Sequence, residues 1–243
     1  MVTLAAKDVR RLFNRKACSW QSKYGRSGKL NARLEQFTVR LSELSPPPAR
    51  ILDLGCGTGD MAAAFGRMGY HVTACDIAGE MIDIARGMHT GSAVEWICLK
   101  PDWRVLPFAD CSFDGIVASS VFEYLIDVQL VATELSRVLR PGGILLLTVP
   151  NPFSYVRRLE GWFRKMLSHH HLLSLLDKVG YAGSYAMYLL LSRNRFSGDS
   201  WHSVLSSAHF AALDEEDFSR DTWRRQAKAP LILLVVKRAA AGS

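Results

Sequence analysis

Short apolar runs alternate with helical segments along residues 50–149, and this alternation constrains the fold more than any other feature of the sequence. The predicted strands are 51–54, 71–75, 94–99, 115–119 and 143–149, and the predicted helices between them are 61–68, 80–88 and 128–139. Strands and helices that alternate at this spacing are typical of a parallel sheet with helices on both faces. The almost continuous apolar run at 144–149 fits a strand buried on both sides. The sequence therefore predicts an α/β fold.

The first 48 residues do not follow this pattern. Their apolar residues recur at three-to-four spacing among arginines and lysines, which predicts two helices with a break at 24–28. Three consecutive prolines at 46–48 cannot continue a helix, so an extended linker is expected there. We therefore divide the chain into an N-terminal helical segment, 1–48, and a core domain, 49–243.

The pattern after Pro150 is weaker. The predicted elements are a basic amphipathic helix at 153–167, a helix at 170–179 ended by Gly180, a strand at 186–191 and a last strand at 231–236. The stretches at about 151–170 and 192–229 are predicted as insertions, the second of them beside the substrate opening.

Composition excludes several classes of protein. The longest apolar runs are far shorter than the roughly 20 residues that cross a bilayer. We expect no secretory signal, because no apolar stretch follows the first basic residues. Five cysteines without a CxxC pair argue against a disulfide framework and a zinc site. The three histidines at 169–171 are no better as metal ligands, because adjacent helical residues point about 100° apart. We expect a cytoplasmic protein without a metal.

A glycine-rich loop is the sharpest local signal. The segment 53–60 reads Asp-Leu-Gly-Cys-Gly-Thr-Gly-Asp and lies between a predicted strand and a predicted helix. Glycines allow a tight turn there and let a ligand approach the backbone closely. The spacing GxGxG, with no lysine after it, differs from that of phosphate-binding and dinucleotide-binding loops. The loop therefore predicts a ligand other than a phosphate.

The residues that follow specify this ligand further. The N-terminus of the helix after the loop favours a carboxylate or another anion. Asp76 ends the next strand, 21 residues after Gly55, where an acidic side chain accepts hydrogen bonds from both ribose hydroxyls. Asp102 can accept from an adenine amine, and the backbone at Trp103 can meet the ring nitrogens. These requirements together describe S-adenosylmethionine.

At this point the sequence resembles the class I S-adenosylmethionine-dependent methyltransferase family, and most closely its quinone-biosynthesis and natural-product branch. The motifs that carry the resemblance are 51–59 (ILDLGCGTG), 72–77 (VTACDI), 102–108 with its Leu-Pro-Phe ending, 112–114 (SFD) and 135–143 (LSRVLRPGG). The resemblance covers about 49–150. It implies a Rossmann-like, mostly parallel sheet of seven strands with helices on both faces, a last strand that is antiparallel, and an N-terminal helical lid.

The resemblance also assigns roles to residues. The glycine loop holds the methionine part of the cofactor, Asp76 the ribose and Asp102 the adenine. The cofactor-binding residues that it implies are Asp53, Gly55, Cys56, Gly57, Gly59, Asp76, Ile77, Met81, Asp102, Trp103, Ser119, Trp20 and Tyr24. Trp20 and Tyr24 are placed at the lid, although aromatic residues there can equally anchor a helix in the core.

Methyl transfer needs a base only where the acceptor keeps its proton. Tyr124 lies where many relatives have histidine, and with a reference pKa near 10 it is a poor base unless strongly perturbed. Glu123 either assists or caps the following helix. His170 is a second candidate base. His202, beside Trp201, fits an ordinary surface histidine.

The segment 150–153 (Pro-Asn-Pro-Phe) is similar to a motif that amino-methyltransferases use to hold a planar nitrogen. That motif follows the fourth strand, whereas here the segment follows the fifth, so we reject methylation of bases and glutamine. Transfer to oxygen is favoured over transfer to carbon.

Charge suggests the nature of the acceptor. Residues 1–50 carry eleven Lys and Arg against three Asp and Glu, 51–150 six against twelve, and 151–243 thirteen against eight. Basic segments that fold over an acidic centre favour a small anionic acceptor, such as an acidic sugar, quinone or natural-product precursor. An ordinary solvated basic surface explains the same charges equally well. The basic, aromatic stretch 157–165 fits a solvated helix, a membrane-surface contact or an anion site. Nucleic acid is not favoured, because the basic residues are scattered. An RNA methyltransferase and a non-catalytic cofactor-binding subunit remain the alternatives.

Overall fold

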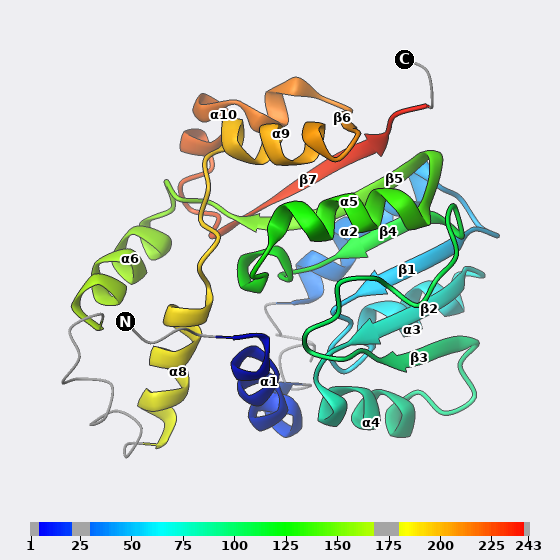
Figure 1. Ribbon diagram of the computed structural model, residues 1–243, viewed down its shortest axis with the longest axis horizontal. Helices are drawn as coiled ribbons and strands as arrows, with labels where there is room; N and C mark the ends of the chain where they lie inside the picture. Colours follow the sequence, from blue (N-terminus) through cyan, green and yellow to red (C-terminus); the bar gives the residue numbers. More distant parts are fainter. Residues whose placement is uncertain (1–4, 21–29, 168–179, 241–243) are drawn as a thin grey trace.

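Seven strands form one sheet in the computed structural model, which describes residues 5–20, 30–167 and 180–240. The strands are β1 (Arg50–Leu54), β2 (His71–Asp76), β3 (Val94–Cys98), β4 (Phe113–Ala118), β5 (Leu139–Pro150), β6 (Phe210–Ala212) and β7 (Leu231–Arg238). Their order is β3-β2-β1-β4-β5-β7-β6 (Figure 1). β7 is antiparallel to both of its neighbours, and the remaining pairs are parallel. The predicted α/β sheet and its antiparallel last strand are confirmed.

Helices cover both faces of this sheet. They are α1 (Ala6–Trp20), α2 (Asn31–Leu44), α3 (Asp60–Arg67), α4 (Gly79–Met88), α5 (Val128–Val138), α6 (Tyr155–Leu167), α8 (Gly180–Leu191), α9 (Gly198–Ser207) and α10 (Arg220–Arg225), with short 3-10 turns η2 (Phe122–Tyr124) and η3 (Glu215–Phe218). The helices α3, α4 and α5 lie where the sequence predicts them. α5 begins at a side-chain cap, because the carboxylate of Asp127 accepts from the amide of Leu130 at 2.9 Å.

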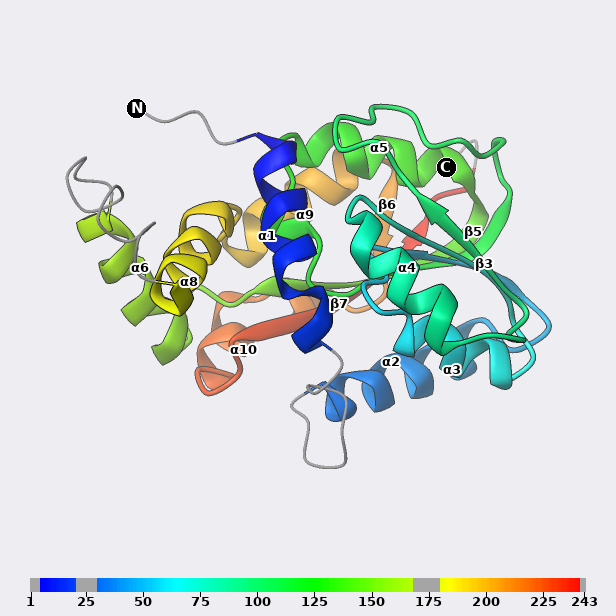
Figure 2. The same ribbon diagram turned by 90° about the horizontal axis from the view of Figure 1, so that it is seen from below.

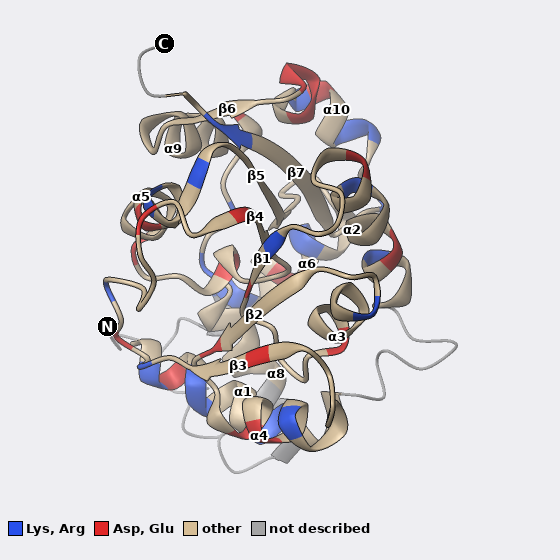
Figure 3. Cartoon of the chain, turned by 90° about the vertical axis from the view of Figure 1, so that its right-hand side faces the viewer, with Lys and Arg blue, Asp and Glu red and all other residues tan. Residues whose placement is uncertain are grey.

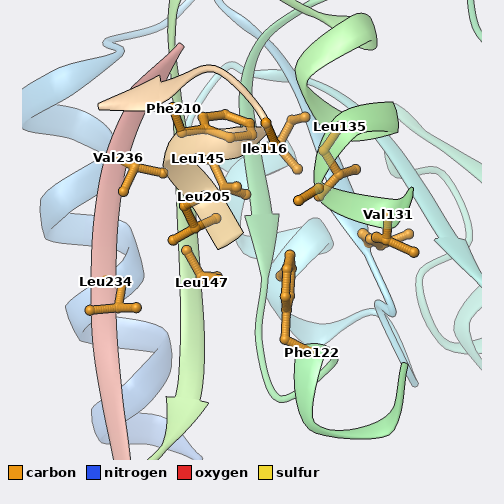
Figure 4. Close-up of a cluster of buried hydrophobic side chains, with 14 of the residues drawn as sticks. Ile116, Phe122, Val131, Leu135, Leu145, Leu147, Leu205, Phe210, Leu234 and Val236 are labelled. Atoms are coloured by element: carbon orange, nitrogen blue, oxygen red, sulfur yellow. The ribbon is translucent and has the colours of Figure 1, made fainter. Parts of the chain in front are cut away.

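The core has two layers, one on each side of β5. Leu145 and Leu147 join the cluster with α5 and α9, part of which Figure 4 draws, while Ile144 and Leu146 join the opposite cluster with α2 and α3. Successive residues of a strand point to opposite faces, so a run of apolar residues fills both layers. The prediction of a strand buried on both faces is thus confirmed.

The N-terminal helices do not form one lid. Phe37 and Leu41 of α2 are fully buried against the sheet, next to Ile51 and Ile144. α2 is therefore a core helix, and the expectation that all of 1–48 forms a lid is wrong for it. Only α1 and the first turn of α2 remain to cover the end of the sheet.

Two expectations for the C-terminal third are also wrong. Residues 186–191, predicted as a strand, form the end of helix α8, and the sixth strand is Phe210–Ala212. An apolar run cannot by itself distinguish a strand from a buried helix, and Met, Ala and Leu favour a helix. The stretch 192–229 is not beside the opening of the site either: it forms α9, β6, η3 and α10 at the edge of the sheet that ends in β6 (Figure 1). The predicted helix at 170–179 lies outside the described residues.

Basic side chains are spread over the fold. Figure 3 shows Lys and Arg on elements all round the sheet rather than along a single stripe. Within the described ranges, no helix combines the length and apolar character needed to span a bilayer.

Candidate functional site

A pocket of about 810 Å³ opens at the carboxyl ends of β1, β2 and β4. Helix α1 lies over this end of the sheet, between α4 and α8 (Figure 2). Ligands of open α/β sheets bind at this edge, where the strands end in loops. The pocket has two walls of different construction, which we call the sheet wall and the helical wall.

The sheet wall contains most of the residues predicted to hold the cofactor. They are Asp53, Gly55, Cys56, Gly57, Asp76, Ile77, Met81, Asp102, Trp103 and Ser119. Tyr24 and His170 lie outside the described residues. Gly59 is not on the pocket surface: a Cβ there would lie 2.4 Å from the ring of Trp96, so this glycine serves the packing of α3.

The glycine loop adopts a conformation that other residues rarely take. The φ angle of Gly55 is +72° and that of Gly57 is +56°. A Cβ on Gly55 would lie 2.4 Å from Cγ2 of Val121. The loop is fixed to the next strand, since the amides of Gly55 and Cys56 donate to the carbonyl of Cys75 at 2.7 and 3.1 Å. The loop therefore presents bare backbone to the pocket.

Asp76 fixes the same loop through its side chain. Its Oδ2 accepts from the amide of Gly57 at 2.9 Å, and its Oδ1 accepts from the amide of Ala78 at 2.8 Å. Burial raises the pKa of Asp76, and the donated amides act in the opposite direction. Each carboxylate oxygen has further lone pairs, so the residue can still accept from ribose hydroxyls.

Asp53 is the most unusual group of the sheet wall. It is 2% exposed, and its Oδ2 has no hydrogen-bond partner. Burial, and then the charge of Asp76, raise its pKa to about 7. A buried carboxylate oxygen without a partner is costly unless a ligand supplies a cation or a donor. S-Adenosylmethionine carries an ammonium and a sulfonium, so the sheet wall fits this cofactor.

The helical wall is basic and aromatic. Lys7, Arg10, Phe13 and Trp20 of α1 line it, together with Arg33 near the start of α2. Among the described lining residues, Arg104 is the basic residue on the sheet wall. Apart from Arg104, the carboxylates thus lie on the sheet wall and the basic side chains on the helical wall.

Aromatic packing holds this wall in place. The ring of Phe13 lies 5.7 Å from that of Trp20 and 5.1 Å from that of Tyr124, both edge-on. Trp20 Nε1 lies 3.4 Å from the place of a Cβ on Gly57, so the indole lies directly over the glycine loop. Arg33 donates to Ser120 Oγ at 2.8 Å and reaches Ser119 Oγ at 3.5 Å. Trp20 therefore packs against Phe13 and also lines the pocket.

The two residues at η2 differ from their predicted roles. Tyr124 lines the pocket, but burial and the neighbouring Glu123 raise its pKa well above 10, which makes it a still poorer base. Glu123 does not line the pocket and does not cap α5. Its carboxylate is buried, 3.3 Å from the guanidinium of Arg157 and 2.6 Å from Ser192 Oγ. Both roles predicted for Glu123 are therefore wrong.

Other predicted polar residues lie away from the pocket. Asn151 donates from its side chain to the carbonyls of Trp223 and Gln226, both at 3.0 Å, and so anchors α10. His202 lies 3.3 Å from Glu215 on the surface. In the described part of the chain, no three His, Cys, Asp and Glu side chains come together as metal ligands.

Sequence reasoning missed Lys7, Arg10 and Arg33 as pocket residues. The excess of basic residues in 1–50 indicated that this segment contacts an anionic ligand, but it did not indicate which side chains face the pocket. That depends on how α1 packs on Tyr124 and α4, which is tertiary structure.

Comparisons with known proteins agree with this geometry. The profile of a family described as "Methyltransferase domain" matches residues 52–147. The chain is 32% identical over 163 residues to a malonyl-[acyl-carrier protein] O-methyltransferase of Erwinia billingiae, covering 67% of this chain and 61% of that protein. It is 30% identical over 171 residues to a ubiquinone biosynthesis O-methyltransferase of Xylella fastidiosa, covering 65% and 63%. The chain thus spans about three fifths of the length of these relatives.

A solved structure extends the likeness in fold to almost the whole chain. The 1,6-didemethyltoxoflavin-N1-methyltransferase of Burkholderia thailandensis, solved with S-adenosylhomocysteine, superposes with a TM-score of 0.63 at 17% identity, covering 99% of this chain and 93% of that one. The match at 52–147, with the glycine loop within it, and the likeness to the malonyl-[acyl-carrier protein] O-methyltransferase show that this part of the chain is a class I S-adenosylmethionine-dependent methyltransferase domain.

Proposed function

We propose that the protein transfers the methyl group of S-adenosylmethionine to an oxygen atom of a small acidic acceptor. The observation that carries this proposal is the contrast across the pocket, with carboxylates at the strand ends and basic side chains on the helices. The acidic side suits a cationic cofactor, and the basic side suits an anionic acceptor.

The sheet wall has a partner for each part of the cofactor. The backbone of Gly55 and Gly57 would hold the methionine part, with Asp53 near its positive charge. Asp76 would accept from the ribose, and Asp102 with Trp103 would contact the adenine. S-Adenosylmethionine, when bound, supplies a methyl group attached to a positively charged sulfur, and this sulfur is a good leaving group. What remains for the chain is to hold the acceptor oxygen in line, an effect worth on the order of 7–11 kcal/mol.

The lack of a suitable base favours an oxygen that is already ionised. The described residues that line the pocket include no histidine, and the pKa of Tyr124 is raised rather than lowered. A carboxylate, or the phenolate of a phenol acidic enough to be ionised in solution, has no proton left to give up, so it needs no base. Lys7, Arg10 and Arg33 would hold such an anion. His170 remains a candidate base for a neutral hydroxyl acceptor.

The names of the relatives support oxygen as the acceptor atom, since both are O-methyltransferases. They leave the identity of the acid open, and a cytoplasmic location stays a prediction.

Methyl-labelled cofactor and extract of the source cell test the proposal. The extract is separated into small molecules, lipids, RNA and protein, and we expect label in the small-molecule fraction. The labelled product should elute earlier from an anion exchanger than its precursor, because methylation removes a negative charge. Label in RNA would favour an RNA methyltransferase. Cofactor binding without label in any fraction would favour a non-catalytic subunit.

A further inference from the structure

Helix α6 exposes its apolar residues and buries charged ones, the reverse of an ordinary surface helix. Five of its large apolar residues are exposed, with Tyr155 at 66%, Trp162 at 58% and Phe163 at 43% of their surface, besides Val156 and Leu159. Its charged residues Arg157 and Glu160 are 5% and 6% exposed. Surface helices normally bury the apolar side. An exposed apolar face of this kind marks an interaction site.

Ion pairs hold the helix in this orientation. The guanidinium of Arg157 lies 3.3 Å from Glu123 and 3.0 Å from Glu160, and it donates to Tyr188 Oη at 2.7 Å. Arg195 lies 3.1 Å from Glu160. Turning α6 to bury its aromatic residues would break these contacts and leave Glu123 buried without its cation. The apolar face is therefore fixed toward the outside.

The exposed residues form one continuous stripe. Successive helical residues are 100° apart, so Tyr155, Leu159 and Trp162 lie above one another, with Val156 and Phe163 beside them. Arg158 and Lys165 are seven residues apart and lie along one border of the stripe, and both are exposed. Glu160, the single acidic residue of α6, points inward. Every exposed charge on α6 is thus positive.

We propose that the exposed face of α6 docks on the surface of a lipid bilayer that contains anionic lipids. The aromatic and aliphatic side chains would enter the headgroup region, and Arg158 and Lys165 would contact the anionic headgroups. Positive charge along the border favours this occupant over a second copy of the chain, whose identical face would bring like charges together.

The position of α6 suits such docking. Among the helices that the structure describes, α6 is the outermost on its side, with α8 between it and α1 in both views (Figures 1 and 2). The ion pair with Glu123 connects it to the residue before Tyr124, which lines the pocket. A docked protein would hold its pocket close to the membrane, which suits an amphiphilic acceptor. Docking itself does not depend on the proposed methyl transfer.

Sedimentation with vesicles tests the proposal. The full-length protein is mixed with vesicles of phosphatidylcholine alone or of phosphatidylcholine with phosphatidylglycerol, and we expect binding to the anionic vesicles. The variant L159S/W162S should lower the partition coefficient at least tenfold, and R158E about fivefold or more. The matched controls are V39S/L213S, which changes two exposed apolar residues elsewhere, and R67E on α3. Both controls should bind like the unchanged protein.

Three outcomes would overturn the proposal. One is no binding to anionic vesicles, and another is binding that the α6 variants leave unchanged. The third is a dimer in light scattering that L159S/W162S dissociates, which would mean that a second copy covers the face. Because the changed residues are exposed, the variants should keep the unfolding midpoint of the unchanged protein, which circular dichroism checks.

Discussion

The two walls of the pocket are built by different means. The sheet wall is fixed locally, because Asp76 and the carbonyl of Cys75 bind the amides of the glycine loop within one βαβ unit. The helical wall is held by long-range contacts, chiefly Phe13 against Tyr124 and Trp20 over Gly57. The first wall is specified by motifs, and the second depends on packing. We therefore expect changes in the sheet wall to affect the cofactor and changes in the basic residues of the helical wall to affect the acceptor.

The largest effect is expected at Gly55. In G55A the new Cβ would press on Val121, and the positive φ would strain any side chain. Cofactor affinity should fall at least a hundredfold in calorimetry. G87A, where a Cβ meets nothing within 4 Å, is the control and should bind normally. Normal binding by G55A would mean that the loop does not hold the cofactor.

The next effect concerns Asp53, where removing the charge should stabilise the protein without cofactor but weaken cofactor binding. Its pKa of about 7 in the folded state lies above the ordinary 3.8, so stability falls as pH rises between these values. Without cofactor, D53N should therefore raise the free energy of unfolding at pH 8. We expect a gain of about 2 kcal/mol, which is below the upper limit that the full pKa shift would set. The gain should shrink toward pH 4 in urea unfolding.

Cofactor affinity should move in the opposite direction, since D53N removes the negative charge that faces the cation. If D53N gains stability and keeps its cofactor affinity, the carboxylate of Asp53 does not interact with the cofactor. D83N, which changes an exposed carboxylate of α4 outside the lining of the pocket, is a control.

D76A should weaken cofactor binding at least tenfold, because two charge-assisted hydrogen bonds to the ribose would be lost. The exposed carboxylate of Asp83 on α4 offers the control D83A, which should bind normally. Since Asp76 also holds Gly57, the smaller analogue methionine should be compared as a ligand. If D76A weakens methionine binding as much as cofactor binding, the residue acts through the loop rather than on the ribose.

A smaller effect, specific to the acceptor, is expected on the helical wall. K7Q/R10Q should raise the KM for an anionic acceptor about fivefold or more, and added salt should reduce the difference. The Kd of the cofactor should stay the same. R11Q changes an exposed residue of α1 that does not line the pocket and should have no effect. A changed cofactor Kd in K7Q/R10Q would contradict the expectation that the basic residues of the helical wall act on the acceptor alone.

The smallest effect is expected for Y124F. With its pKa raised well above 10, Tyr124 stays protonated and serves packing against Phe13. The value of kcat should change less than threefold, and its pH profile should not shift. A loss of kcat at every pH would assign chemistry to the hydroxyl group.

The sequence predicted the regions that local rules govern. Strands β1 to β5 and helices α3 to α5 were recognised from apolar period and turn residues, and the sheet wall from its glycines and carboxylates. The sixth strand was missed because Phe210–Ala212 has only three residues. The end of α8 was taken for a strand because an apolar run fits both structures. The direction of α6 could not be predicted, because it depends on Glu123 and Arg195, which are distant in sequence.

The hydrogen bonds of Asp76 have a thermodynamic consequence. Because they fix the glycine loop without a ligand, little conformational entropy is left to lose when the cofactor enters. Association should then be fast and should show no slow phase from loop rearrangement. The glycine loop should therefore not limit the exchange of the spent cofactor for a fresh one.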